Sequence, residues 1–255
     1  MATPVDESDA VEFAKARLGF EPDEKQAAVL RSEAKRGILN CSRQWGKSTV
    51  AAAKAVHRAY SRAGSLVLVA SPSERQSAEF LRKMAEFVRR LGIVPKGDGD
   101  NKMSLQFPNG SRIVGLPGVE GTGRGFSRVS LLLIDEAAVV SDRIYRMLRP
   151  TVAVGGGDIW LMSTPRGKRG FFYETWATGG SNWMKVSVPV TECPRISKEY
   201  LEEERTELGA ASFRQEFMCE FVDSGWGVFS APEVEAALDE GLEAFDFGSV
   251  WDDQG

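Results

Sequence analysis

The chain has 255 residues, of which 42% are hydrophobic, and this is enough for one large domain with an ordinary core. No apolar run approaches the roughly 18 residues that a membrane-spanning helix needs, and the acidic N-terminus lacks the basic start of a signal peptide, so we expect a soluble, cytoplasmic protein. Three cysteines without metal spacing and a single histidine argue against a zinc site or a disulfide scaffold.

The charge is unevenly distributed along the chain. Residues 231–255 contain eight acidic residues and no Lys or Arg, so this segment has a charge of −8. Because the whole chain has a net charge of −4, residues 1–230 carry +4. A positively charged body is compatible with a polyanionic partner, although +4 is also ordinary for a solvated surface. We interpret residues 231–255 as an acidic linker or tail.

Two helices are predicted before the first strand. Residues 4–18 have an amphipathic pattern, and a second helix begins at Pro22 or Asp23. Gln26, within this second helix, allows two interpretations. It is either a surface residue or a carboxamide that donates to and accepts from the edge of adenine, and thereby selects ATP.

A phosphate-binding loop is predicted between a strand at residues 37–40 and a helix at residues 50–60. A flexible turn that opens a helix gathers backbone N–H groups where the helix dipole favours an anion. Gly46, Lys47 and Ser48 match the end of the Walker A motif, in which the lysine contacts the β- and γ-phosphates and the hydroxyl contacts Mg²⁺. The position that usually opens the motif with glycine is Cys41 here. The predicted nucleotide-binding residues of this loop are Ser42, Arg43, Gln44, Trp45, Gly46, Lys47, Ser48 and Thr49.

Arg43 lies inside this predicted loop. A guanidinium at this position can reach the γ-phosphate from its own subunit, or pair with an acidic residue of a lid when the site is empty. The alternative is an ordinary surface residue of the loop. We include Arg43 and Lys47 among the candidate catalytic residues.

The middle of the chain predicts further elements of an α/β fold. The apolar run at residues 65–70 is typical of a strand buried on both faces of a parallel sheet. A helix follows at residues 74–91, with its aromatic side chains in the core. Residues 101–116 alternate and turn as a β-hairpin does, and residues 118–125 form a glycine-rich loop.

A second chemical signal is the apolar run at residues 131–134, which is followed by Asp135 and Glu136. A buried strand that ends in an acid delivers a carboxylate to the carboxyl edge of the sheet, where ligands of open α/β sheets lie. This is the Walker B pattern, so we predict that Asp135 holds Mg²⁺ together with Ser48, and that Glu136 polarises the attacking water. The alternative is that the two acids cap the next helix.

A third strand is predicted at residues 158–162, and it ends in Ser163 and Thr164. Hydroxyl groups beside the Walker B strand are placed to sense a γ-phosphate, whereas the alternative is a simple turn shaped by Pro165 and Gly167. One more strand is predicted at residues 183–190. A charged helix pair, broken near Gly209, follows at residues 197–217.

The order of these motifs, over about residues 20–230, resembles the ATPase half of the large subunits of bacteriophage DNA-packaging terminases. The resemblance rests on Ser-Arg-Gln-x-Gly-Lys-Ser, Arg-Gly-x-Ser, the apolar run with Asp-Glu, and Ser-Thr-Pro. It implies an α/β fold of the P-loop NTPase (ASCE) class, with a mainly parallel central sheet flanked by helices and a small lid. It also implies that Ser163 and Thr164 form the coupling motif, and that Arg124 is a trans-acting arginine finger, for which Arg128 is an alternative. The other interpretation of Arg124 is an exposed loop residue or a contact to DNA phosphate.

The resemblance further implies a motor that hydrolyses ATP with Mg²⁺ and moves double-stranded DNA into a procapsid in the host cell cytoplasm. Expected partners are the portal protein, the small terminase subunit and further copies in a ring, which we expect to be a pentamer, with a monomer in isolation. We assign residues 1–190 to the ATPase core and 191–230 to the lid. Too few residues follow for a nuclease domain, so no nuclease activity is expected. Alternatives are a superfamily 2 helicase, for whose second domain there is no room, and an adaptor that binds nucleotide without hydrolysing it.

Overall fold

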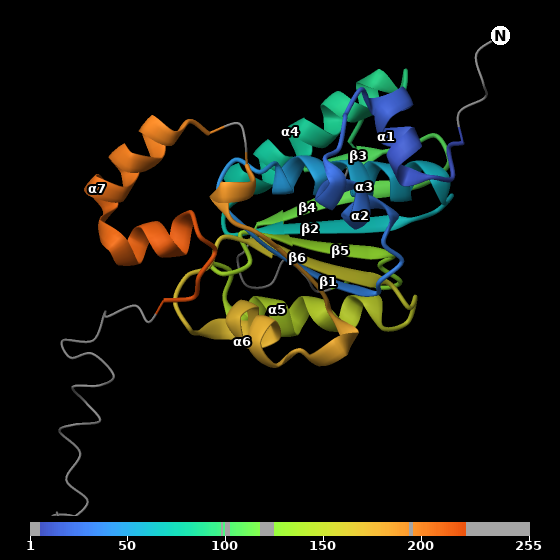
Figure 1. The fold of residues 1–255 in the computed structure, drawn as a ribbon. Helices are drawn as coiled ribbons and strands as arrows, with labels where there is room; N and C mark the ends of the chain where they lie inside the picture. Colours follow the sequence, from blue (N-terminus) through green and yellow to red (C-terminus); the bar gives the residue numbers. More distant parts are fainter. Residues whose placement is uncertain (1–5, 98, 100–102, 118–124, 194–195, 223–255) are drawn as a thin grey trace, which may run out of the picture. The chain divides into compact units, whose positions relative to one another are not determined.

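A seven-stranded sheet forms the centre of the molecule, for which we describe a computed structural model (Figure 1). The described residues are 6–97, 99, 103–117, 125–193 and 196–222. The strands are β1 (Arg36–Cys41), β2 (Leu66–Ser71), β3 (Ser104–Gln106), β4 (Arg112–Pro117), β5 (Leu131–Asp135), β6 (Asp158–Ser163) and β7 (Met184–Val188). Their spatial order is β3-β4-β2-β5-β6-β1-β7, and every neighbouring pair is parallel except β3 and β4, which form the predicted hairpin.

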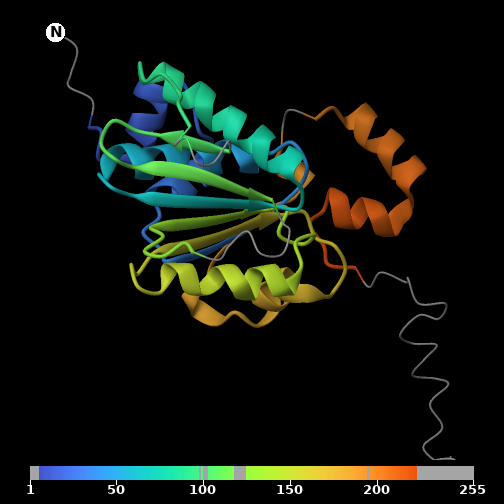
Figure 2. The same ribbon diagram turned by 180° about the vertical axis from the view of Figure 1, so that it is seen from behind.

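Helices cover both faces of this sheet (Figures 1 and 2). One face is packed against α1 to α4 and the other against α5 and α6, and each face has its own apolar core. The helices are α1 (Ala10–Leu18), α2 (Glu24–Arg31), α3 (Lys47–Ser61), α4 (Glu74–Arg90), α5 (Asp142–Leu148), α6 (Gly170–Thr178) and α7 (Lys198–Glu216), with short 3₁₀ turns at Arg149–Val152, Gly180–Asn182 and Val190–Glu192. In the part of the chain that the structure describes, no helix combines the length and the apolarity that crossing a membrane would require.

The central strands are buried on both faces, as their apolar runs predict. All residues of β2, β5 and β6 are buried, and each fully buried Leu or Val contributes roughly 1.5–3 kcal/mol relative to exposure. The packing above β1 is tight enough to select a residue type. A Cβ atom on Gly37 would lie 2.3 Å from the indole of Trp160, so a larger side chain cannot be accommodated there without displacing that ring.

The strand order identifies the fold class. The strand that precedes the predicted phosphate loop, β1, pairs with β6 and β7, and the predicted Walker B strand, β5, pairs with β2 and β6. One strand, β6, therefore stands between the two nucleotide motifs. This insertion is the extra strand of the predicted class, so the fold is an α/β P-loop NTPase fold.

Three helices differ from the prediction or add to it. The first helix begins at Ala10 rather than at residue 4, because the Asp9 carboxylate accepts from the backbone N–H groups of Val11 and Glu12 and so caps it there. Helices α5 and α6 were not predicted. The predicted break in the last helix pair is confirmed, since Gly209 in α7 has φ 75° and ψ 161°.

Candidate functional site

The loop between β1 and α3 turns sharply at the carboxyl edge of the sheet. Gln44 (φ 65°) and Gly46 (φ 98°) adopt left-handed backbone conformations, which let the chain reverse into the helix. The N-cap of α3 is Gly46, which has no side chain to cap the helix, and the N–H of Thr49 donates to the Gly46 carbonyl at 2.9 Å. The N–H groups of Lys47 and Ser48, together with the helix dipole, therefore favour an anion at this helix start.

Trp45 anchors this loop to the helix α2. Its side chain is buried, its indole N–H donates to Asp23 Oδ2 at 2.9 Å, and its carbonyl accepts from Gln26 Nε2 at 2.9 Å. The other end of the Gln26 carboxamide accepts from the backbone N–H of Asp23 at 3.0 Å. Gln26 is only 1% exposed, so its interpretation as a surface residue is wrong. Its reading of adenine stays a prediction, and in this structure its amide joins α2 to the loop.

The remaining loop residues divide into buried and exposed positions. Ser42 is fully buried, and its backbone N–H donates to the carbonyl of Val188 at 2.9 Å. Arg43 and Gln44 are exposed, Lys47 is buried, and Ser48 and Thr49 are half-buried in the first turn of α3. The loop therefore has a fixed base and a tip that is open to solvent.

The end of β5 brings two carboxylates to the same edge. Lys47 Nζ lies 3.6 Å from Glu136 Oε1, and Ser163 Oγ donates to Glu136 Oε2 at 3.3 Å. These three side chains come from the loop and from two neighbouring strands, so the sheet order brings them together. Glu136 itself has φ 47°, a conformation that is uncommon for a residue other than glycine.

One of the two alternatives for the strand ends is wrong. The residue that caps the helix after β5 is Ser141, whose hydroxyl accepts from the N–H of Ile144, so the two carboxylates do not cap it. Ser163 is the last residue of β6 and is fully buried, and a turn that contains Gly167, with φ 71°, follows it, so the turn alternative stays open. Thr164 follows it and is half-buried.

Buried polar atoms without partners gather at this edge. Among the described residues, Asn40 Oδ1, Ser71 Oγ and Asp135 Oδ1 are buried and make no hydrogen bond, and they lie at the carboxyl ends of β1, β2 and β5. Burial, followed by the neighbouring Glu136, raises the pKa of Asp135 to about 6. An orphaned carboxylate oxygen near a serine hydroxyl is the oxygen donor set that Mg²⁺ prefers, so Asp135 and Ser48 fit the predicted metal.

Arg43 makes one of the two contacts that the sequence suggested. Its Nε donates to Glu216 Oε2, at the end of α7, at 2.8 Å. One residue earlier, the side chain of Gln215 accepts from the backbone N–H of Gly167, in the turn after β6, at 2.8 Å. The end of α7 thus contacts both the loop and the turn that follows β6.

A helix that the sequence analysis treated only as core also reaches the site. A cavity of about 130 Å³ is lined by Ser48, Asp135 and Glu136 on one side and by residues of α4 on the other. The α4 residues are Gln76, Glu79, Phe80 and Lys83. Gln76 and Lys83 are seven residues apart and so share one face of the helix, but only the pairing of β2 with β5 brings that face to the carboxylates.

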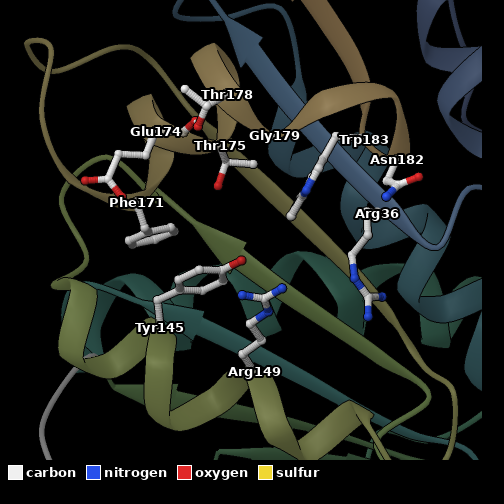
Figure 3. Close-up of a pocket in the computed structure, with 10 residues that line it drawn as sticks. All are labelled: Arg36, Tyr145, Arg149, Phe171, Glu174, Thr175, Thr178, Gly179, Asn182 and Trp183. Atoms are coloured by element: carbon white, nitrogen blue, oxygen red, sulfur yellow. The ribbon is translucent and has the colours of Figure 1, made fainter.

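The predicted arginine finger, Arg124, lies outside the described residues. Its alternative, Arg128, is exposed, has φ 56° and precedes β5, so it lies at the opposite edge of the sheet from Glu136. A second cavity, of about 460 Å³, lies at that opposite edge and includes Arg36, Arg149 and Trp183 among its lining residues (Figure 3). None of the sequence motifs contributes to it.

Known proteins match this chain in sequence and in structure. The family model described as "Terminase large subunit, T4likevirus-type, N-terminal" matches residues 38–236. The terminase large subunits of Thermus phage G20c and Thermus virus P23-45 are each 27% identical to the chain, over 85% of the chain and 52% of the relative. The chain therefore spans about half the length of these curated relatives.

Solved structures support the fold assignment. The ATPase domain of the Thermus phage P74-26 large terminase has a TM-score of 0.72 and 24% identity, over 82% of this chain and 97% of that one. The large terminase of the thermophilic bacteriophage D6E in complex with ADP has a TM-score of 0.68 and 15% identity, over 79% of this chain and 54% of that one. Together with the strand order, these likenesses confirm the predicted fold. Because the family model covers most of the sequence, the chain belongs to the terminase large subunit family and corresponds to its N-terminal part.

Proposed function

We propose that this chain is a Mg²⁺-dependent ATPase that acts as the motor of a phage terminase, driving double-stranded DNA into a procapsid. The observation that carries the proposal is the cluster of Lys47, Glu136 and Ser163 beside the orphaned Asp135 carboxylate. A cation, a candidate base and a metal-binding oxygen meet where a helix N-terminus is open to an anion. The relatives described as a large terminase ATPase domain and as an ADP complex are in line with this chemistry.

The residues of the loop contribute to triphosphate binding in different ways. Lys47 and the N–H groups of α3 contact the β- and γ-phosphates, while Ser42, Gln44, Gly46 and Thr49 shape the backbone around them. Ser48 and Asp135 hold Mg²⁺, which withdraws negative charge from the phosphates when bound. The Gln26 amide supports the loop through its hydrogen bond to the Trp45 carbonyl, and it contributes to adenine selection.

The contacts of Glu136 suggest how its role as a base depends on the nucleotide. In the structure, Lys47 Nζ lies 3.6 Å from Glu136 Oε1. A phosphate that attracts the Lys47 ammonium leaves this carboxylate free to accept a proton from the attacking water. The Ser163 hydroxyl donates to the other carboxylate oxygen and keeps its orientation.

In the proposed motor, Ser163 and Thr164 couple hydrolysis to movement of α7. Ser163 bonds to Glu136, the turn after β6 bonds to Gln215, and the loop bonds to Glu216 through Arg43. A change at the γ-phosphate therefore acts on both contacts of α7. We propose that residues 191–230 work as the lid in this way.

The assembly completes the proposed motor. Arg124 of one copy acts on the phosphoryl group bound to its neighbour in a homo-oligomeric ring, expected to be a pentamer, whereas the isolated chain is a slow monomer. The ring works with the portal protein and the small terminase subunit in the host cell cytoplasm. Mixing Arg124→Ala with Glu136→Gln tests this arrangement, because some interfaces of a mixed ring contain an intact pair and regain activity.

The proposed activity is tested with Glu136→Gln. Glutamine keeps the hydrogen bond to water but does not accept its proton, so we expect MgATP binding to be retained and hydrolysis to fall roughly 10²- to 10⁴-fold. Phosphate release and isothermal titration measure the two quantities, and Glu86→Gln, on the exposed side of α4, is the matched control. Hydrolysis at the parental rate rejects Glu136 as the base. A parent protein that binds MgATP but never hydrolyses it, with or without DNA, is an adaptor rather than a motor.

A further inference from the structure

We propose that Lys83 of α4 contacts the γ-phosphate end of the bound nucleotide and makes the site prefer ATP to ADP. The structural basis is the cavity in which Lys83 faces Ser48 and the two carboxylates at the end of β5. This inference rests on the proposed ATPase function. It adds a cation to the site from an element that carries none of the nucleotide-binding motifs.

The packing of α4 directs Lys83 towards this cavity. Phe80, one turn earlier, is 3% exposed and forms part of the cavity wall, and Met84, the next residue, is fully buried. Lys83 is half-buried at the rim of this apolar stripe. A lysine at such a position lays its aliphatic stem along the apolar wall and presents its ammonium group to the polar side.

The ammonium group of Lys83 has no hydrogen-bond or ion-pair partner among the residues that the structure describes. Glu79, the acid one turn earlier, pairs instead with Arg82, at 2.5 Å. A half-buried cation that faces two carboxylates without pairing to either is available for a ligand anion.

The location of Lys83 in the cavity favours a contact with the γ-phosphate. The adenine end of the site is the side of Gln26 and Trp45, whereas Lys83 shares its cavity with Glu136, the proposed base for attack on the γ-phosphate. ADP lacks that phosphate. A contact from Lys83 therefore strengthens ATP binding more than ADP binding, and it offsets the charge that Asp135 and Glu136 place beside a polyanion.

The experiment compares the affinities of two nucleotides for the parent chain and for three variants. Dissociation constants for AMP-PNP and for ADP, each with Mg²⁺, are measured by isothermal titration on the parent chain and on Lys83→Ala. Losing a charge-assisted hydrogen bond typically weakens binding about 10- to 100-fold, so we expect AMP-PNP to lose at least about tenfold and ADP to change less than about threefold. Lys83→Arg keeps the preference because it keeps the charge. Arg82→Ala, one residue away on the same helix and exposed, leaves both constants unchanged.

The outcomes distinguish a failure of the inference about Lys83 from a failure of the proposed ATPase function. Equal losses for both nucleotides overturn the inference and make Lys83 a general electrostatic contribution, and unchanged constants overturn it as well. A parent chain that binds neither nucleotide contradicts the proposed function instead. Thermal unfolding of each variant confirms that it is folded, and Lys83→Gln replaces Lys83→Ala if the alanine variant is not.

Discussion

At the amino edge of the sheet, where the strands begin, buried charges are paired, whereas at the carboxyl edge several buried polar atoms have no partner. Arg58 pairs with Asp158 and donates to the carbonyl of Ser130. The buried Lys54 ammonium donates to the backbone carbonyls of Val29, Leu30 and Ser32. These groups join α2, α3 and two strands, so their role is to hold the layers together.

At the carboxyl edge the corresponding groups are left unsatisfied. Asn40 Oδ1, Ser71 Oγ and Asp135 Oδ1 are orphaned in the described structure. Two further orphans lie in β6, but Asp158 Oδ1 is 3.3 Å from the Lys35 ammonium, and Trp160 Nε1 belongs to a ring that packs under Lys54. Burying a polar group without a partner costs stability. The two edges therefore differ in kind: the amino edge bonds its buried charges, whereas the carboxyl edge keeps unpartnered polar atoms, as the proposed ligand site requires.

The largest effect that tests this contrast is expected from Arg58→Met. Removing Arg58 leaves the buried Asp158 carboxylate with only the exposed Lys35 ammonium as a charge partner, and breaking a buried pair in this way costs up to about 3–5 kcal/mol. We therefore expect a large loss of unfolding free energy in urea, with the ADP dissociation constant of the folded variant unchanged. Arg62→Met, at the exposed C-cap of α3, is the control. A loss below about 1 kcal/mol, or a parallel loss of ADP affinity, would show that the edges are not separate in function.

A smaller effect, with a defined pH dependence, is expected at Lys54. Burial, followed by repulsion from Arg58, lowers its pKa from 10.5 to about 8. Between these values the unfolded chain binds more protons than the folded one, so this group makes stability rise with pH by up to about 3 kcal/mol between pH 8 and pH 10.5. Below pH 8 its cost is constant.

Lys54→Met lacks this titration. The difference in unfolding free energy between parent and variant should be constant from pH 6 to 7.5 and should then shift in favour of the parent as the pH rises to 10. Other groups titrate in both proteins and cancel in the difference. A difference that does not vary with pH would contradict the lowered pKa and would leave Lys54 as an ordinary ammonium cap on α2.

The elements that sequence could predict are those whose signal is local. The strands β1, β2, β5 and β6 were predicted because each is an apolar run that ends in polar or turn residues. Helix α5 was missed because it has only seven residues, although Ser141 and Asp142 are a start signal. Helix α6 was missed because it begins at a glycine and is mostly apolar, so it has no amphipathic period.

The residues of the candidate site also differ in whether their signal is local in the sequence. Lys47, Asp135 and Glu136 could be predicted because each belongs to a short motif that is contiguous in the chain. Lys83 was not found, because its place depends on which strands are neighbours. The Arg43 contact stands between these cases, since an acid of a lid was expected as its partner but only the folded chain identifies Glu216.

The smallest stability effect is expected at the carboxyl edge, from Arg43→Ala. The Arg43 side chain is 65% exposed, and exposed ion pairs are worth about 0–1 kcal/mol, so unfolding in urea should barely change. Hydrolysis should nevertheless fall far more than ADP binding, because the guanidinium is proposed to move from Glu216 to the γ-phosphate. Equal losses would reduce Arg43 to a general electrostatic contribution.

A charge reversal, Arg43→Glu with Glu216→Arg, separates the two roles, because it restores the ion pair to α7 but removes the cation from the loop. Recovery of hydrolysis in this double variant would mean that Arg43 acts by holding α7. Continued loss, with Glu216→Ala alone near the parental rate, would mean that the loop needs its cation for the phosphate.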